Sequence, residues 1–257
     1  MELRLDGKVA LVTGSSKGIG KGIAEELARS GADVTVTWST DRSGADETAG
    51  VIRALGRRAL VVQVDVADES QVDVMFASHL GEFGRIDILV ANAGMGMPGK
   101  LHEIPTSTWD HVLRTNLYGP FFCMRLAARQ MIEQGDGGRI ITISSVHEEA
   151  PSSGGGPYCV SKSGLKMLMQ NMALEVGEYG ITVNGIAPGM TVTPMNGQIM
   201  ADEALRKERS GLIVMKEAGY PHDIAAMAVF LASDQASYCT GATYFVDGGW
   251  MLTWPPV

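Results

Sequence analysis

The sequence predicts one α/β domain built on a doubly wound, Rossmann-like parallel sheet with helices on both faces. Short runs rich in valine and isoleucine alternate along the chain with longer segments whose apolar residues recur every three or four positions. That alternation is typical of β-α-β units. A length of 257 residues and a hydrophobic content of 45% suffice for a large core, and no Pro/Ser-rich linker or internal repeat divides the chain. We therefore expect a single domain over residues 1–257.

Seven strand-length runs are expected, and each is rich in β-branched residues. They are 8–13, 33–38, 59–64, 86–91, 139–144, 181–187 and 242–247. The intervening segments include 20–31 and 69–84, which have helical periodicity and close on glycine, as the C-terminus of a helix often does. The stretch 188–220 breaks this rhythm. Its length without strand character predicts a substrate-binding loop or lid.

Composition and charge exclude several classes of protein. Twenty-one basic against twenty-nine acidic residues give a net charge of −8, which disfavours a nucleic-acid binder because phosphate neutralisation needs clustered Lys and Arg. No run reaches the roughly 18 apolar residues of a membrane-spanning helix, and the N-terminal apolar run is too short for a signal peptide. The three cysteines lie far apart without C-x-x-C spacing. We expect no disulfide framework, no metal site and a cytoplasmic protein.

A glycine-rich turn lies directly between the first strand and the first helix. Gly14, Gly18 and Gly20 have the spacing G-x3-G-x-G, which lets backbone N–H groups approach a pyrophosphate at the helix N-terminus. Glycines also merely end strands, but this position before an amphipathic helix favours nucleotide binding. A P-loop does not fit, because Lys21 is followed by glycine and G-x4-G-K-[ST] is absent.

Further motifs, in the same order along the chain, resemble the short-chain dehydrogenase/reductase family. The matches are NAG at 92–94, Y-x3-K at 158–162, PG at 188–189, DGG at 247–249, Asp65, Asn116 and Ser145. The resemblance covers essentially the whole chain. It implies seven parallel strands, a nicotinamide cofactor and reversible hydride transfer between an alcohol and a carbonyl, and it implies a homotetramer.

The stretch SSVHEEAPSSGGGPYCVSKSG at 144–164 carries most of the candidate catalytic residues. Tyr158 and Lys162 are four apart, so they share one face of a helix. A phenol has a pKa of about 10, and we expect the Lys162 ammonium to lower it toward neutrality so that Tyr158 can exchange a proton. Ser145 would hold the substrate oxygen against the phenol. The resemblance implies that Lys162 also binds the nicotinamide ribose and that Asn116 supports a water-linked proton path.

The residues after the second strand bear on the choice between NAD and NADP. A carboxylate there binds both ribose hydroxyls of NAD, whereas basic or hydroxyl groups accept the 2′-phosphate of NADP. Trp38 stands where NAD-preferring relatives carry an acid, and Ser39 and Thr40 follow it. Lys17 lies in the glycine turn. We expect NADP to be preferred, with NAD as the alternative because Asp41 lies close by in the sequence.

The resemblance also implies which individual residues make the remaining contacts with the cofactor. Asp65 and Val66 should border the adenine, and Asn92 the adenosine ribose. Asp65 could instead cap the following helix, and Asn92 could make a buried structural hydrogen bond. Thr193 should contact the nicotinamide carboxamide. The full expected cofactor-binding set is Gly14, Ser16, Lys17, Gly18, Ile19, Gly20, Ser39, Thr40, Asp65, Val66, Asn92, Ala93, Gly94, Tyr158, Lys162, Pro188, Gly189, Thr191 and Thr193, with Arg42 as a third phosphate contact.

Local stretches are similar to bacterial glucose 1-dehydrogenases within that family. They are SSVHE at 144–148, TPMN at 193–196 and the C-terminal run 236–256. A polyhydroxylated substrate needs several donors and acceptors in the cleft. The expected substrate-binding residues are Ser145, His147, Tyr158 and Asn196, with Glu148 and Glu149 as further polar groups or as a solvated loop. Gly96 stands where glucose dehydrogenases tend to carry an acid, and Met95 and Met97 make that wall more apolar.

We therefore expect an NADP-preferring sugar or polyol dehydrogenase. A reductase for 3-oxoacyl or other ketone substrates is the alternative within the same class. A catalytically silent nucleotide-binding scaffold is the alternative outside it, and the complete catalytic set argues against that. The apolar tail either pairs subunits or packs within one subunit. Its residues are Trp250, Trp254, Pro255 and Pro256.

Overall fold

The computed structural model describes residues 3–197 and 201–253, and it confirms the predicted fold class. One sheet of seven parallel strands has the order β3-β2-β1-β4-β5-β6-β7. The strands are β1 (Val9–Val12), β2 (Asp33–Trp38), β3 (Ala59–Gln63), β4 (Ile88–Ala91), β5 (Gly138–Ile143), β6 (Ile181–Pro188) and β7 (Thr243–Val246). Each lies within the expected run or within two residues of it.

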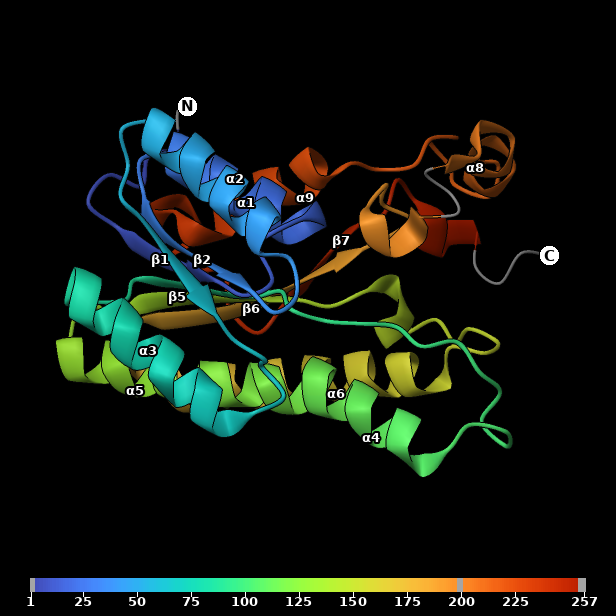
Figure 1. Cartoon of the computed structure of the whole chain (residues 1–257), viewed down its shortest axis with the longest axis horizontal. Helices are drawn as coiled ribbons and strands as arrows, with labels where there is room; N and C mark the ends of the chain where they lie inside the picture. The colour runs from blue at the N-terminus through green and yellow to red at the C-terminus, as the bar shows by residue number, and fades with distance from the viewer. Residues whose placement is uncertain (1–2, 198–200, 254–257) are drawn as a thin grey trace.

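Helices cover both faces of the sheet (Figure 1), with α1, α2 and α9 on one side and α3, α4, α5 and α6 on the other. Their bounds are α1 (Gly18–Arg29), α2 (Arg42–Ala54), α3 (Glu69–Phe83), α4 (Thr106–Leu113), α5 (Gly119–Gln134), α6 (Gly156–Val176), α8 (Glu203–Ser210) and α9 (Pro221–Ala232). A π-helical turn, η1 (Arg114–Tyr118), joins α4 to α5. Short 3-10 turns include η2 (Val146–Glu148), η3 (Gly177–Tyr179), η4 (Pro194–Asn196) and η6 (Trp250–Thr253).

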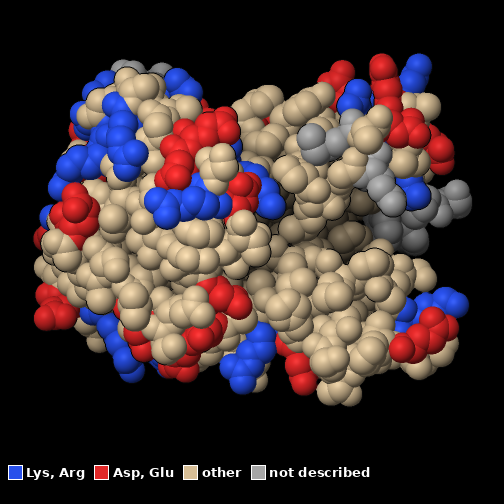
Figure 2. Space-filling view, in the orientation of Figure 1, with Lys and Arg blue, Asp and Glu red and all other residues tan. Residues whose placement is uncertain are grey.

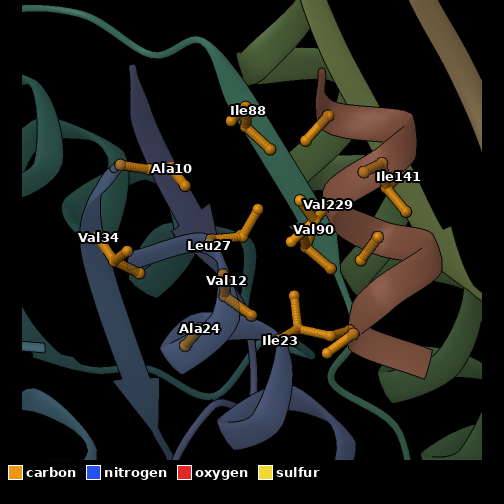
Figure 3. Close-up of a cluster of buried hydrophobic side chains, with 14 of the residues drawn as sticks. Ala10, Val12, Ile23, Ala24, Leu27, Val34, Ile88, Val90, Ile141 and Val229 are labelled. Carbon is orange, nitrogen blue, oxygen red and sulfur yellow. The ribbon is translucent and has the colours of Figure 1, made fainter. Parts of the chain in front are cut away.

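Alternate residues of the central strands supply two separate cores. Ala10 and Val12 of β1 pack with Ile23 and Leu27 of α1 on one face of the sheet (Figure 3). Leu11, between them, packs on the opposite face among residues of α3 and α5. Successive side chains of a strand point to opposite faces, so one hydrophobic run serves both cores.

The strand order reverses between β1 and β4, and this places the binding crevice. Chains leaving the carboxyl ends of those two strands diverge to opposite sides of the sheet, which opens a crevice there. The segments that follow β1 and β4 are the glycine turn and the NAG stretch. On the same side of the molecule, Figure 2 shows a hollow between α8 and the α4–α6 layer whose walls are mainly neither acidic nor basic.

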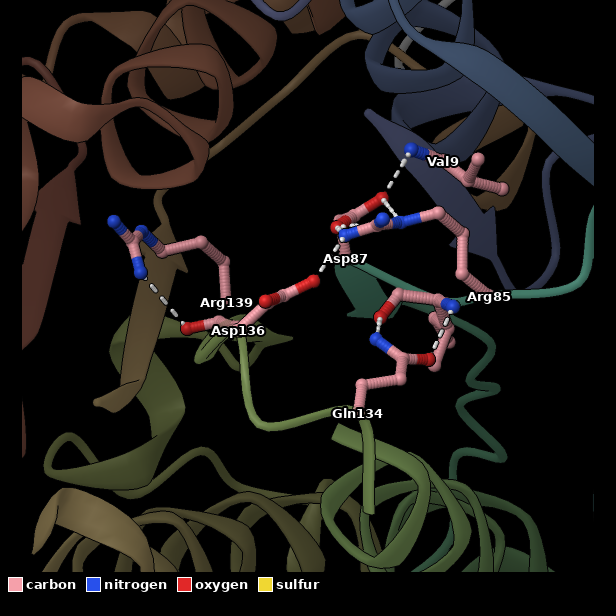
Figure 4. Close-up of polar contacts among 8 residues, drawn as sticks. Val9, Arg85, Asp87, Gln134, Asp136 and Arg139 are labelled. Carbon is pink, nitrogen blue, oxygen red and sulfur yellow. Dashed lines mark hydrogen bonds and ion pairs between the residues drawn. The ribbon is translucent and has the colours of Figure 1, made fainter. Parts of the chain in front are cut away.

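The opposite, amino-terminal ends of the strands are tied by a polar network (Figure 4). The Asp87 carboxylate accepts from Val9 N at 2.8 Å and from Arg85 Nη2 at 2.6 Å. Arg85 also reaches Asp136 at 3.3 Å. Gln134 brackets Ile86, accepting from its N–H and donating to its carbonyl, each at 2.9 Å. The network joins β1, β4 and the turn before β5.

The segment expected as a lid leaves the sheet at the end of β6 and contains η4 and α8. The two ends of this segment are joined by backbone hydrogen bonds. Val192 N donates to Gly219 O at 2.8 Å, and Gly219 N donates to Met190 O at 2.9 Å. The role of this segment as a lid stays a prediction. Among the described residues, no helix has both the length and the apolarity needed to span a bilayer.

Candidate active site

The glycine turn is shaped for a ligand that must approach the backbone closely. Gly14 and Gly18 have φ of +64° and +59°, a region that disfavours other residues. A Cβ on Gly20 would lie 2.4 Å from both Asn92 Nδ2 and Gly14 O. The N-cap of α1, Lys17, makes no side-chain cap hydrogen bond, whereas an aspartate caps α2, α3 and α8. The turn and helix end therefore fit a pyrophosphate.

Asn92 and Thr13 hold this turn in place. Asn92 Nδ2 donates to Thr13 O at 2.8 Å and to Gly14 O at 3.1 Å. Thr13 Oγ1 accepts from the N–H groups of Asn92 and Ala93 at 3.0 Å each. The structural role weighed for Asn92 is thus present, and its contact with a ribose stays a prediction.

The chain after β6 lies against the turn. A Cβ on Gly18 would be 3.5 Å from Thr193 Cβ, so Thr193 borders the helix N-terminus. Gly189 is packed so closely that its Cβ would lie 2.7 Å from Asp247 Cα. Thr191 is buried, and its backbone carbonyl accepts from Asn196 Nδ2 at 2.8 Å. Asn196, expected to bind substrate, therefore uses its amide to secure the loop.

The end of β2 presents the groups expected to choose the cofactor. Ser39, Thr40 and Arg42 are exposed there, and Lys17 is exposed at the start of α1. Asp41 is committed elsewhere, because its Oδ1 accepts from Gly44 N at 3.0 Å and caps α2. The Asp41 carboxylate thus serves the start of α2, and the preference for NADP stays a prediction.

Asp65 and Val66 follow β3 as expected. The cap role considered for Asp65 is wrong, because Asp68 Oδ1 accepts from Ser70 N at 2.9 Å and caps α3. Asp65 Oδ1 accepts from Ala67 N at 3.0 Å, and the Asp65 side chain is exposed. Val66 is buried against Gly119, so little of its side chain is exposed for contact with an adenine.

Helix α6 brings Tyr158 and Lys162 together as their spacing predicts. Lys162 Nζ lies 5.6 Å from the centroid of the Tyr158 ring, and it donates to Ile143 O, the end of β5, at 2.7 Å. Lys162 is 4% exposed. A Cβ on Gly94 would be 3.6 Å from that ammonium, which puts the NAG stretch beside it.

The electrostatics of this pair differ from the expectation. Burial raises the pKa of Tyr158 above its usual value, while a hydrogen bond with Ser145 lowers it. Burial lowers the pKa of Lys162 to about 8. The predicted lowering of the phenol pKa by Lys162 is therefore not seen in the chain by itself, because desolvation penalises the charged form of both groups.

Ser145 lies at the end of β5, within reach of the phenol. It is buried, and its Oγ accepts from His147 N at 3.2 Å, which starts η2. Asn116 lies on the π-helical turn and is fully buried. Its amide brackets Met95, accepting from the N–H and donating to the carbonyl at 2.8 Å each. Asn116 Nδ2 also reaches Ser161 Oγ at 3.1 Å.

Two aromatic contacts complete the cleft. The His147 ring lies 6.2 Å from Tyr158 and 6.0 Å from Trp250, edge to face with both. His147 Nδ1 also bonds Ala150 O at 2.8 Å. Trp250 therefore packs against the site within its own subunit, while Trp254, Pro255 and Pro256 lie outside the described residues. Sequence reasoning missed Trp250 as a cleft residue, because the contact joins two segments about a hundred positions apart in the chain.

Comparison with known proteins now identifies the family. The family model described as enoyl-(acyl carrier protein) reductase matches residues 14–251. This chain belongs to the short-chain dehydrogenase/reductase family. Members of this family are NAD(P)-dependent oxidoreductases that act on alcohol and carbonyl groups, and so is this chain.

Three similar proteins show the range of names within the family. The chain is 40% identical to "Glucose 1-dehydrogenase 2" of Bacillus subtilis (strain 168), covering 96% of each protein. It is 42% identical to "3beta-hydroxysteroid dehydrogenase 1" of Eggerthella lenta, covering 96% of this chain and 95% of that one. Its fold matches a gluconate 5-dehydrogenase from Burkholderia cenocepacia J2315 in complex with NADP and tartrate, with a TM-score of 0.91, 34% identity and 98% of each chain covered.

Proposed function

We propose that the protein is an NADP-preferring dehydrogenase of sugar or polyol alcohols in which Tyr158 is the proton-transfer group. The observation that carries this proposal is the convergence of Tyr158, Ser145 and Lys162 at the carboxyl ends of the strands. They lie next to the NAG stretch, which itself holds the glycine turn. One crevice thus offers an acid–base group and a cradle for a dinucleotide.

The residues present fit NAD(P). The glycine turn and the uncapped start of α1 would hold the pyrophosphate, and Lys162 would bind the nicotinamide ribose. When bound, the cofactor supplies the redox chemistry, accepting a hydride from an alcohol carbon or returning one to a carbonyl carbon. The protein's task is to orient the substrate and to move the proton.

Tyr158 supplies that proton. Because burial raises its pKa, the phenol is protonated at neutral pH and is an acid ready to donate to a carbonyl oxygen during reduction. In oxidation the same oxygen takes the hydroxyl proton of the alcohol. Ser145 holds the substrate oxygen beside the phenol, so hydride and proton transfer occur in a fixed geometry. The oxidative rate should rise as pH rises above neutrality, because only phenolate accepts the proton.

NADP preference rests on the groups after β2. Ser39, Thr40 and Lys17 are exposed at the crevice edge, and Asp41 is turned into the cap of α2. Arg42 stands over the Trp38 ring at 5.7 Å and pairs with Asp46 at 3.1 Å. A 2′-phosphate would find hydroxyl and cationic groups here, and the nearby Asp41 and Asp46 carboxylates are already engaged, in the α2 cap and with Arg42.

A sugar or polyol is supported by the similarity to glucose 1-dehydrogenase 2 and to a gluconate 5-dehydrogenase. A second candidate function, reduction of an apolar ketone, is favoured by the apolar side chains near the cleft. Met97 and Met195 are exposed near the cleft segments, Trp250 packs on His147, and the Asn196 amide is used by the loop. The similarity to a 3beta-hydroxysteroid dehydrogenase points the same way.

A panel of substrates with both cofactors tests the proposal. D-glucose, L-rhamnose, gluconate and sorbitol would be offered with NADP+ or NAD+, and acetoin, a 3-oxoacyl thioester and a 3-ketosteroid with NADPH or NADH. We expect turnover of at least one aldose or polyol, faster with NADP+. Turnover of ketones with none on aldoses, aldonates or polyols would establish the second candidate, and no turnover of any compound would support a silent scaffold.

We also propose that the protein is a homotetramer. Apolar side chains on α5 and α6 are exposed in the single chain, among them Phe121, Val160, Met167 and Leu174. Covering them would remove apolar surface from water. Light scattering should give four times the chain mass, and a mass equal to the chain would refute the assembly. A variant ending before Trp250 would show whether the tail takes part.

A further inference from the structure

Glu148 carries a carboxylate that is buried inside the protein. It lies on η2, three residues after Ser145, and its side chain is 0% exposed. Neither carboxylate oxygen has a hydrogen-bond partner within the described parts of the chain. A charge without such partners is costly to bury, and proteins retain one where nearby opposite charges compensate it.

The compensating charges come from α6. Ser163 Oγ donates to the Glu148 carbonyl at 2.8 Å, and this bond docks η2 on that helix. Lys166 Nζ lies 3.5 Å from Glu148 Oε1. Lys162 lies four residues before Lys166, so the two lysines share one face of α6. The carboxylate therefore faces the α6 segment that bears both lysines.

Lys166 does not need Glu148 as its partner. Its ammonium is paired with Glu149 Oε1 at 2.5 Å, and that carboxylate is 46% exposed. The two adjacent glutamates therefore differ in environment. Glu149 is partly exposed and paired with Lys166, whereas the Glu148 side chain is wholly buried. Of the two carboxylates, only that of Glu148 is wholly buried where η2 packs on α6, so solvent screens its charge less than that of Glu149.

Lys162 needs a compensating anion. Its ammonium is almost wholly buried and donates to a neutral carbonyl, that of Ile143. Burial lowers the pKa of Lys162 to about 8, and the negative charge of Glu148 opposes that change. A neutral Lys162 amine would present no cation to the phenol or to a bound dinucleotide.

We infer that Glu148 is a positioning residue of the active site, whose buried carboxylate keeps Lys162 in its charged form. Its catalytic consequence rests on the proposed function, while its effect on Lys162 does not. Further titratable residues lie on these two elements: His147 on η2, and Tyr158 and Cys159 at the start of α6. β6, which also packs on η2, has no titratable side chain.

Titration of Lys162 tests the inference directly. The full-length protein would be labelled with [13Cε]lysine, and the Lys162 resonance assigned by its absence from Lys162→Met. In wild type we expect a midpoint of about 8. In Glu148→Gln we expect it lower by about one pH unit, the smaller end of the effect of an opposite charge. The neutral side chain keeps the shape of glutamate.

Glu149→Gln is the matched control. It removes the same charge from the adjacent residue, and we expect the Lys162 midpoint to stay within about 0.2 pH units of wild type because that carboxylate is solvated. A second pair, Glu148→Asp and Glu148→Asn, repeats the charge comparison with a shorter side chain. A Glu148→Gln protein that does not fold therefore leaves the test standing.

Equal Lys162 midpoints in wild type and in both neutral variants of Glu148 would overturn the inference. So would an equal shift in Glu149→Gln, since a general effect of surface charge would explain it. The titration uses neither substrate nor dinucleotide, so a failure of the proposed function would show only in turnover assays. Where turnover is found, the alkaline limb of the kcat/KM profile for carbonyl reduction should move to lower pH in Glu148→Gln and not in Glu149→Gln.

Discussion

The two ends of the parallel sheet are built on opposite principles. At the amino ends of the strands, the Asp87 carboxylate is matched by Arg85 and Val9 N, and Gln134 satisfies both backbone groups of Ile86 (Figure 4). At the carboxyl ends, the Glu148 carboxylate and the Ser144 hydroxyl are buried without hydrogen-bond partners among the described residues, and the Lys162 ammonium is also buried. The network at the amino ends stabilises the fold, whereas buried polar groups without partners, as at the carboxyl ends, are typical of sites that bind a ligand.

The largest effect on stability should come from the satisfied end. Asp87→Ala leaves Val9 N without its partner and Arg85 with one carboxylate fewer, so we expect a loss of about 3 kcal/mol in the free energy of unfolding. Denaturant unfolding measures it. The kcat/KM of the folded fraction should stay within a factor of two of wild type. A loss of turnover greater than the loss of folded protein would mean that the network at the amino ends also affects catalysis.

His79 tests whether a buried polar group away from both ends affects stability alone. Its Nδ1 bonds Thr35 Oγ1 at 2.7 Å, and burial lowers the pKa of His79 to about 4 from 6.5. The unfolded chain therefore binds a proton between those pH values that the folded chain does not. Stability that is present above pH 6.5 should fall by about 3 kcal/mol as pH drops toward 4.

His79→Gln removes that titrating group. Comparing its unfolding free energy with wild type from pH 7 to 4 measures the contribution of His79. We expect the variant to be less stable at pH 7 and its decline with acid to be shallower. Parallel declines in the two proteins would mean that other groups account for the acid sensitivity.

Ser145→Ala should affect the chemistry with little effect on the fold. The hydroxyl bonds the phenol and His147 N at the cleft, so we expect kcat/KM to fall about 100-fold. The melting temperature should change by less than about 3 °C. Ser78→Ala is a control, because the exposed Ser78 hydroxyl bonds the Val74 carbonyl one turn earlier on α3. Similar activities of the two variants would remove Ser145 from the site.

A pair of glycine substitutions gives the smallest and most local contrast. Gly20→Ala places a methyl 2.4 Å from Gly14 O, so we expect the dissociation constant for NADPH, measured by fluorescence quenching, to rise at least about tenfold. Gly50→Ala, in the exposed middle of α2, meets nothing within 4 Å and should stabilise the protein by about 0.5–1 kcal/mol. Equal dinucleotide affinity in both variants would show that the turn does not bind the cofactor.

Strand positions and the glycine turn could be predicted because their signals are local. Val9–Val12 and Ile88–Ala91 are continuous apolar runs, and the positive φ of Gly14 and Gly18 follows directly from a turn between strand and helix. The pairing of Tyr158 with Lys162 was equally accessible, since helical spacing alone sets it. These features need no knowledge of distant contacts.

The features of the site that could not be predicted from the sequence depend on contacts between segments far apart in the chain. Whether Glu148 or Glu149 is buried is decided by how η2 docks on α6 through Ser163. The raised pKa of Tyr158 depends on burial, which spacing does not encode. The contact of Trp250 with His147 joins the segments that follow β7 and β5, which are far apart in the sequence. Asp68, and not Asp65 as considered from the sequence, caps α3, because the helix begins at Glu69.

Replacing the phenol tests the central claim, that Tyr158 moves the proton, most directly. Tyr158→Phe would be compared with wild type in NADPH-dependent carbonyl reduction, with Tyr179→Phe, on the exposed turn η3, as control. We predict a loss of about 1,000-fold or more in kcat for Tyr158→Phe, with NADPH affinity and melting temperature retained, and no loss for the control. A Tyr158→Phe protein that turns over within about threefold of wild type would contradict it.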